Sequence, residues 1–168
     1  MTRPTAWFAV VAVLVTAAAV VWLRHSGGPK GRQADPLATL PQCTSHMKQL
    51  CLAALMYTQD NGQKLPTAAW PDQLAKYVRN PRFYACPGAP EQTIGYALNA
   101  AVAGAELTSV KAPAETILFF EADVAQKPAS GGADLLTSGA RHGGEVVVGF
   151  VDGHVTTMPQ EDAKRLLR

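Results

Sequence analysis

An unbroken apolar run near the N-terminus constrains this chain more than any other feature. Ala6 to Leu23 is 18 residues long, and its only hydroxyl belongs to Thr16. At a rise of about 1.5 Å per residue, a helix of this length spans roughly 27 Å, close to the hydrocarbon core of a bilayer. Trp7 and Trp22 lie at opposite ends of the run, where indole rings favour the membrane interfaces. The run therefore predicts a single transmembrane helix.

A cleaved signal peptide is the alternative interpretation of this run. Arg3 would begin such a signal, and Ala17–Ala19 offers the small residues of a cleavage site. The apolar run continues past that site to Leu23, which favours an uncleaved anchor.

Charge is unevenly distributed along the chain. Residues 1–32 carry four basic and no acidic side chains, whereas the rest carries 11 basic and 13 acidic ones. A folded domain without a basic surplus argues against nucleic-acid binding. Arg24, Lys30 and Arg32 follow the apolar run, while Arg3 precedes it. The positive-inside rule therefore favours, weakly, a cytoplasmic C-terminal domain.

The sequence divides into an anchor, a linker and a globular domain. Residues 1–24 form the predicted anchor, and residues 25–38 form a linker rich in glycine and proline, which cannot sustain a helix. The globular domain is predicted to span residues 39–168. Its first helix should begin near Leu40, with Thr39 and Gln42 as a capping box, and end at Asp60 before Asn61-Gly62. Apolar residues at helical spacing predict its buried side: Cys43, Met47, Leu50, Ala54 and Tyr57.

Four shorter segments have clear secondary-structure signals. We expect a helix over Pro71–Val78, an extended piece over Phe83–Gly88, a buried strand over Thr116–Glu121, and a last helix over Pro159–Arg168. Together with a hairpin over Glu145–Met158, these segments predict an α+β domain. Its one main helix should pack on a small antiparallel sheet.

The hairpin is predicted to turn at Asp152-Gly153, a pair that two-residue type I′ turns prefer. That turn pairs Val151 with His154 and Phe150 with Val155. Four apolar residues should then share one face of the hairpin and point into the core: Val146, Val148, Phe150 and Val155.

The three cysteines leave two interpretations open. Cys43 and Cys51 are eight residues apart on one helix, about 12 Å along its axis, which is too far for a disulfide. Cys86 lies in a loop and could reach Cys43, so a Cys43–Cys86 disulfide is a candidate if the domain is extracytoplasmic. Three buried free thiols are the alternative. No C-x-x-C pair is present, which excludes zinc-ribbon and thioredoxin motifs.

Histidines and carboxylates cluster near the predicted hairpin. His142, Asp152 and His154 are candidate metal ligands, and Glu121 could approach them from a neighbouring strand. A structural role for His142, Asp152 and Gly153 at the hairpin is the favoured interpretation, because their spacing matches no hydrolytic signature. The chain also has no G-x-S-x-G, H-E-x-x-H or P-loop. We therefore expect no enzyme activity and no cofactor.

Four blocks of the sequence resemble a bacterial pseudopilin-like family that carries a prepilin-type H-x9-DG domain. The first block runs from Cys43 to Tyr57, and the second ends at Phe83–Gly88. The third combines Tyr96–Asn99 with Pro113–Thr116, and the fourth extends from His142 to Asp152-Gly153. The N-terminus departs from the family's pattern, because no glycine precedes the apolar run and no glutamate lies inside it.

The resemblance implies a membrane-anchored envelope protein of a type II secretion or type IV pilus-like system. It implies a single-pass protein of the bacterial inner membrane, anchored through residues 6–23, with an extracytoplasmic domain. Its partners would be secretion or pilus-like proteins, or further copies of itself. Two alternatives remain: a membrane-tethered module that binds a ligand or metal without assembling, and a metal-dependent enzyme that uses His142, Asp152 and His154.

Overall fold

A long helix dominates the described part of the chain. The computed structural model describes residues 36–124, 129–139 and 141–168. Helix α2 spans Pro36–Asp60 and ends before Gly62, whose φ of +65° is left-handed, as predicted for the helix stop. The predicted start near Leu40 was wrong, because the helix already includes residues 36–39 and therefore places Thr39 inside it.

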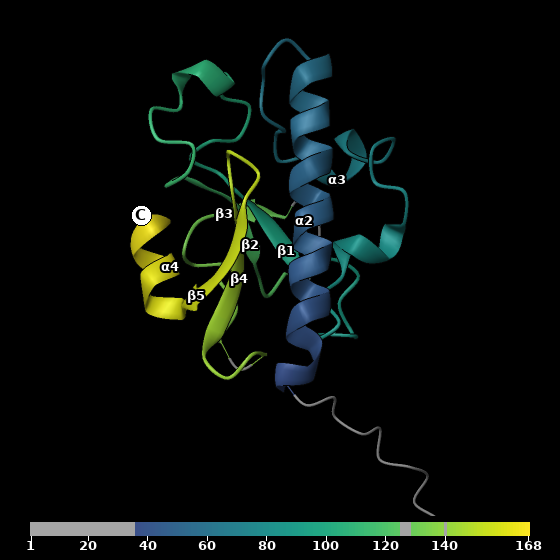
Figure 1. Ribbon diagram of the computed structural model, residues 1–168, viewed down its shortest axis with the longest axis vertical. Coiled ribbons are helices and arrows are strands. Elements are labelled where there is room, and N and C mark those ends of the chain that lie inside the picture. The colour runs from purple at the N-terminus through teal and green to yellow at the C-terminus, as the bar shows by residue number, and fades with distance from the viewer. Residues whose placement is uncertain (1–35, 125–128, 140) are drawn as a thin grey trace, which may run out of the picture. The chain divides into compact units, whose positions relative to one another are not determined.

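The buried side of α2 agrees with the predicted stripe. Four of the predicted side chains have no exposed surface: Cys43, Met47, Leu50 and Ala54. Tyr57 is half-buried at the end of the same stripe. α2 contacts three strands of a sheet, and Figure 1 shows the helix running alongside that sheet.

The sheet has five strands in the order β3-β1-β2-β4-β5. They span Tyr96–Asn99 (β1), Ile117–Glu121 (β2), Ser130–Gly131 (β3), Glu145–Phe150 (β4) and Val155–Pro159 (β5). Every neighbouring pair is antiparallel except β1 with β3, which is parallel. The α+β prediction of one main helix on a small sheet is therefore confirmed, apart from this parallel edge.

The hairpin of β4 and β5 has a longer loop than predicted. Gly149, not Phe150, lies opposite Val155. The Phe150 N–H donates to the His154 carbonyl, so these two residues close a loop of three residues, Val151–Gly153. Gly153 has a φ of +94°, the left-handed position that ends a three-residue hairpin loop. The extra loop residue shifts the register by one, and Val155 therefore lies on the face opposite to the one predicted.

The segments that connect α2 to β1 and β1 to β2 contain only short helices and turns. Helix α3 (Trp70–Gln73) begins one residue before the predicted Pro71–Val78 helix and ends five residues before its predicted end, and hydrogen-bonded turns follow it. Two 3₁₀ helices, η1 (Pro81–Tyr84) and η2 (Leu107–Ser109), lie farther along. η1 replaces the start of the predicted extended piece, because the Asn80 side chain caps it by accepting from the Arg82 N–H at 3.0 Å.

A short C-terminal helix completes the domain. α4 spans Gln160–Leu166, close to the predicted bounds, and contacts β4 and β5. In Figure 1 the sheet lies between α2 and α4. This arrangement explains why five of the six β4 residues are buried, although only alternate ones face α2.

The predicted membrane segment, residues 6–23, lies outside the described residues, as do the first 24 residues as a whole. The last three residues of the predicted linker, residues 36–38, are helical. Within the described part of the chain, no helix combines the length and apolar character that a membrane crossing requires.

Candidate functional site

Four potential ligand side chains from separate segments meet inside the domain. Cys43 comes from α2, Cys86 from the turn after η1, Glu121 from the end of β2, and His142 from the residues before β4. Their sulfur, oxygen and nitrogen atoms all lie within 4.8 Å of one another, and all four residues are buried. We call these four residues the buried cluster.

Hydrogen bonds connect three members of the buried cluster directly. His142 Nε2 lies 2.8 Å from Glu121 Oε1, and the Cys86 thiol donates to the same oxygen at 3.1 Å. Cys86 Sγ is also 3.8 Å from His142 Nε2. The second oxygen of Glu121 accepts the backbone N–H of Val147 at 2.9 Å, which fixes the carboxylate between β2 and β4.

Local backbone features hold the two thiols in place. The Tyr96 hydroxyl donates to the carbonyl of Cys43 at 3.2 Å and joins β1 to α2 at this point. Gly95 lets the chain around Cys86 approach β1, because a Cβ on Gly95 would lie 2.6 Å from the Cys86 nitrogen. A side chain on Gly88 would likewise come within 3.3 Å of the His142 ring.

Two of the three cysteine thiols, those of Cys51 and Cys86, have raised pKa values. Hydrogen bonding to Cys43, followed by burial, raises the pKa of Cys86 above its ordinary value. Burial, with a smaller contribution from the charge of Asp152, raises the pKa of Cys51 to about 12. Because the thiolate is the reactive form of cysteine, neither thiol is an activated nucleophile.

The other predicted ligands lie at the opposite end of the hairpin. Asp152 Oδ1 accepts the His154 backbone N–H at 3.0 Å and lies 2.6 Å from the His154 ring. The His154 ring stacks on Phe150 with a centroid distance of 4.2 Å. β4 separates this exposed pair from His142 by roughly 17 Å, given about 3.3 Å per strand residue. The structure thus divides the predicted trio between two places and joins His142 to Glu121 instead.

His46 and Arg141 flank the buried cluster. His46 Nδ1 lies 2.8 Å from the carbonyl of Ala85 and joins α2 to the residue before Cys86. Arg141 directly precedes His142. Its Nη2 donates to Oδ1 of Asp123 at 2.5 Å, and Asp123 lies two residues after Glu121. These contacts hold the chain in place next to three members of the buried cluster: Cys86, Glu121 and His142.

Sequence reasoning found the members of the buried cluster but not their combination. Cys43 and Cys86 were paired only as a candidate disulfide; the structure brings them together as free thiols. Nothing in the local spacing indicates that they join Glu121 and His142. The available signal is Glu121 itself, a carboxylate at the end of an otherwise apolar strand, since charged groups are rarely buried without a partner.

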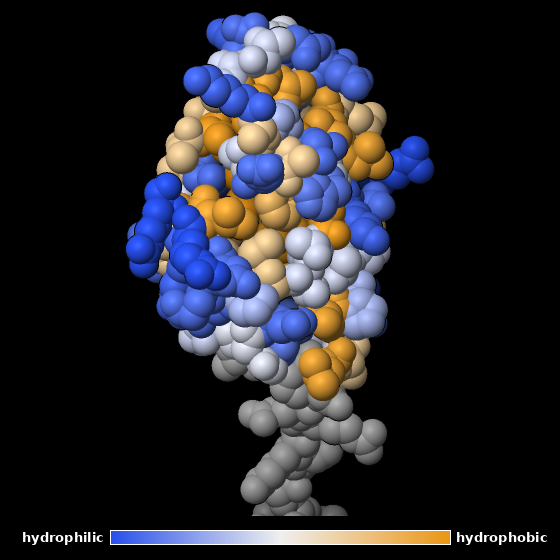
Figure 2. Space-filling view, turned by 60° about the vertical axis from the view of Figure 1, so that its left-hand side comes forward, coloured by the Kyte–Doolittle hydropathy of each residue, from blue (hydrophilic) through white to orange (hydrophobic). Residues whose placement is uncertain are grey.

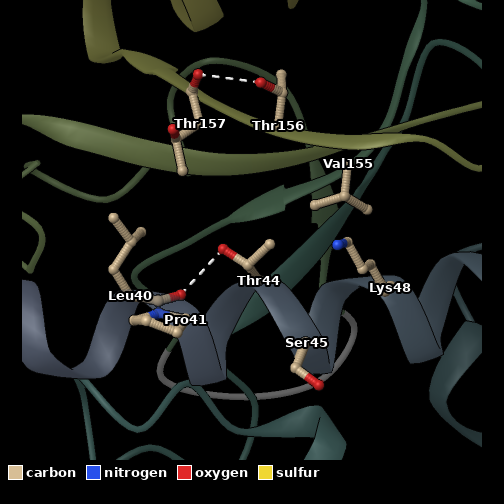
Figure 3. Close-up of a pocket in the computed structure, with 8 residues that line it drawn as sticks. All are labelled: Leu40, Pro41, Thr44, Ser45, Lys48, Val155, Thr156 and Thr157. Carbon is tan, nitrogen blue, oxygen red and sulfur yellow. Dashed lines mark hydrogen bonds between the residues drawn. The ribbon is translucent and has the colours of Figure 1, made fainter.

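A separate groove lies on the surface between α2 and β5 (Figure 3). It is about 580 Å³ in volume, and Leu40, Thr44 and Lys48 of α2 face Val155 and Thr157 of β5 across it. Figure 2 shows apolar patches on the molecular surface separated by hydrophilic side chains, with no single continuous apolar face in this view. None of the residues that line the groove belongs to the buried cluster.

No protein-family model, curated protein or solved structure matches this chain.

Proposed function

We propose that this chain is a membrane-anchored, pseudopilin-like protein of the bacterial envelope that acts through protein contacts. Its role would be structural and related to type II secretion or type IV pilus-like systems. The proposal places the anchor at residues 6–23 and the globular domain on the extracytoplasmic side.

One observation carries the proposal: each of the four sequence blocks that resemble the pseudopilin-like family contributes buried residues to the core of the domain. The first block forms the buried side of α2, and the third supplies β1. The fourth block brackets β4, from His142 to Gly153. If the chain shares the globular domain of that family, the blocks should contain the residues that pack the main helix and the sheet. Their place in the core therefore supports the resemblance.

The buried cluster favours a second candidate function, a membrane-tethered module that binds a ligand or metal and does not assemble. Its four side chains are of types that bind metal ions, and a purely structural head does not need them together. The two functions differ in whether the protein has stable protein neighbours in the cell.

Cross-linking in intact cells distinguishes the two functions. A photoreactive residue in place of Leu52, which is 53% exposed on α2, would report neighbours of the main helix. The same residue in place of Glu115, exposed in the loop before β2, serves as the matched control. The full chain carries a C-terminal tag for recovery and identification of the products.

We expect the Leu52 position to give a ladder of self-linked chains or links to secretion or pilus-like components. The Glu115 position should give fewer or different products. Recovery of only the uncrosslinked chain in the membrane fraction from both positions would contradict an assembly role and favour the tethered module. Recovery of the chain outside the membrane fraction would contradict the anchor itself.

A further inference from the structure

We propose that Cys43, Cys86, Glu121 and His142 bind one zinc ion as a closed structural site. The proposal goes beyond an envelope role and does not depend on it, since it rests only on the geometry and chemistry of the buried cluster.

The spacing of the ligand atoms suits a tetrahedral ion. With zinc–sulfur distances of about 2.3 Å and zinc–nitrogen or zinc–oxygen distances of about 2.0 Å, tetrahedral geometry separates neighbouring ligand atoms by roughly 3.2 to 3.8 Å. The separations in the buried cluster are 2.8 Å for His142 to Glu121, 3.1 Å for Cys86 to Glu121, and 3.8 Å for Cys86 to His142. Movements of a few tenths of an ångström would therefore place these three ligand atoms around an ion, and the Cys43 sulfur, which lies within 4.8 Å of each of them, would approach by at most about 1.3 Å.

The ligand types favour zinc over the hard cations. Two sulfurs, an imidazole nitrogen and a carboxylate oxygen are ligands of zinc, whereas calcium and magnesium take oxygen ligands almost exclusively. Zinc replaces the two thiol protons, which pass to solvent, and binds Nε2 of neutral His142 in the tautomer that carries its proton on Nδ1. The ion thereby takes the place of the hydrogen bonds that now connect the cluster.

Surrounding groups orient the ligands as a metal site requires. Oε2 of Glu121 accepts the Val147 backbone N–H, which leaves Oε1 directed at the other three ligand atoms. The Cys43 backbone is held by Tyr96, and Cys86 is held by its close approach to Gly95. Such supporting contacts fix ligand orientation in metal sites and contribute to affinity.

The site is closed and therefore structural. Four protein ligands complete a tetrahedral zinc ion and leave no position for water or substrate, unlike catalytic sites with three protein ligands. All four residues are buried, and the groove between α2 and β5 does not reach them. The ion would join α2, the turn after η1, β2 and the residues before β4.

A disulfide between Cys43 and Cys86 uses the same two sulfurs and excludes the zinc site. The experiment therefore starts from the full chain, purified in detergent from whichever cell fraction contains it, without reductant or chelator. Mass spectrometry of alkylated peptides then determines the state of the two cysteines, and elemental analysis determines bound zinc. Zinc is next added under reducing conditions, and excess metal is removed by desalting.

We expect free Cys43 and Cys86 and one zinc per chain after desalting. Cys86→Ser and His142→Asn should lose the stoichiometric zinc. Cys51→Ala is the matched control, because it removes a buried α2 cysteine outside the cluster and should retain the metal.

Cobalt substitution tests the proposal without any variant, in case a cluster substitution prevents folding. Co²⁺ bound to the parent protein should show the visible bands of tetrahedral cobalt and sulfur-to-cobalt charge transfer in the near ultraviolet. Reduced protein that retains no zinc, or cobalt bands without a sulfur contribution, would overturn the proposal. A Cys43–Cys86 disulfide in the protein isolated from cells would also overturn it. None of these results depends on the cross-linking pattern, so this proposal and the envelope function can fail separately.

Discussion

Gly149 controls how closely the main helix approaches the sheet. It lies in β4 beneath α2, and a Cβ added there would be 2.3 Å from Cys51 Sγ and 3.3 Å from two Met47 atoms. Non-bonded contacts between such atoms are favourable at about 3.5 to 4.0 Å, so α2 or β4 would have to move by more than 1 Å. Both α2 side chains have no exposed surface, which leaves them little space to yield.

We therefore expect Gly149→Ala to lower the free energy of unfolding by about 1 to 3 kcal/mol, the usual cost of overpacking a core. For a chain of this size, each kcal/mol corresponds to roughly 2 to 4 °C in Tm. Thermal unfolding of the full chain in detergent, followed by near-ultraviolet circular dichroism, measures the change.

Two further variants make this prediction specific. Gly132→Ala is the matched control, because the nearest atom to its added Cβ is 3.5 Å away and the Tm should change little. Cys51→Ala removes the sulfur that clashes, so the Gly149→Ala/Cys51→Ala double variant should regain part of the loss. The reasoning is refuted if Gly149→Ala unfolds at the parental temperature. It is also refuted if removal of the Cys51 sulfur leaves the effect of Gly149→Ala unchanged, since contacting residues should show coupling.

Three further predictions follow from individual side chains. Gly153→Ala should destabilise the hairpin by about 1 to 2 kcal/mol in urea unfolding, because its left-handed φ strains any residue with a Cβ; an unchanged midpoint would contradict the loop geometry. Burial alone would raise the pKa of Asp123, but a hydrogen bond from the Ser138 backbone N–H and the charge of Arg141 outweigh it and lower the pKa below its ordinary value. The ionised Asp123 carboxylate therefore stabilises the fold at pH values above its unfolded pKa, and this stabilisation is lost as the pH falls through its folded pKa. Asp123→Asn should consequently make the free energy of unfolding fall less steeply as the pH is lowered. The Cys51 thiol, with a pKa of about 12 and no exposed surface, should resist iodoacetamide at pH 8 until the protein unfolds; rapid alkylation of the native chain would show that the sheet does not cover this side of α2.

Local patterns in the sequence were sufficient to predict the helix and the strand whose residues have a clear hydrophobic or β-forming pattern. The apolar stripe from Cys43 to Ala54 predicted the buried side of α2, and the residues of Thr116–Glu121 predicted β2. Each signal arises within a few turns or residues of the chain, so no tertiary information is needed. The hairpin was also predicted, but a Gly at the second turn position suits both two-residue and three-residue loops. Its register was therefore wrong by one residue.

Features that depend on tertiary pairing were not predictable in this way. β3 is only Ser130–Gly131, and its parallel pairing with β1 leaves no periodic signal in two residues. The start of α2 was missed because Thr39 and Gln42 have the spacing of a cap, although Thr39 is buried inside the helix. The buried cluster joins four segments with no common local motif, and only the folded sheet brings Glu121 and His142 within hydrogen-bond distance.

The wide separation of the cluster residues along the chain also has a consequence for synthesis. His142 leaves the ribosome 99 residues after Cys43, which corresponds to roughly 5 to 20 s at ordinary elongation rates. Until β2 and the residues before β4 have docked, both thiols are exposed to whatever oxidants the compartment contains. Oxidation of Cys43 and Cys86 is therefore easier during this interval than afterwards, because the finished fold buries both sulfurs.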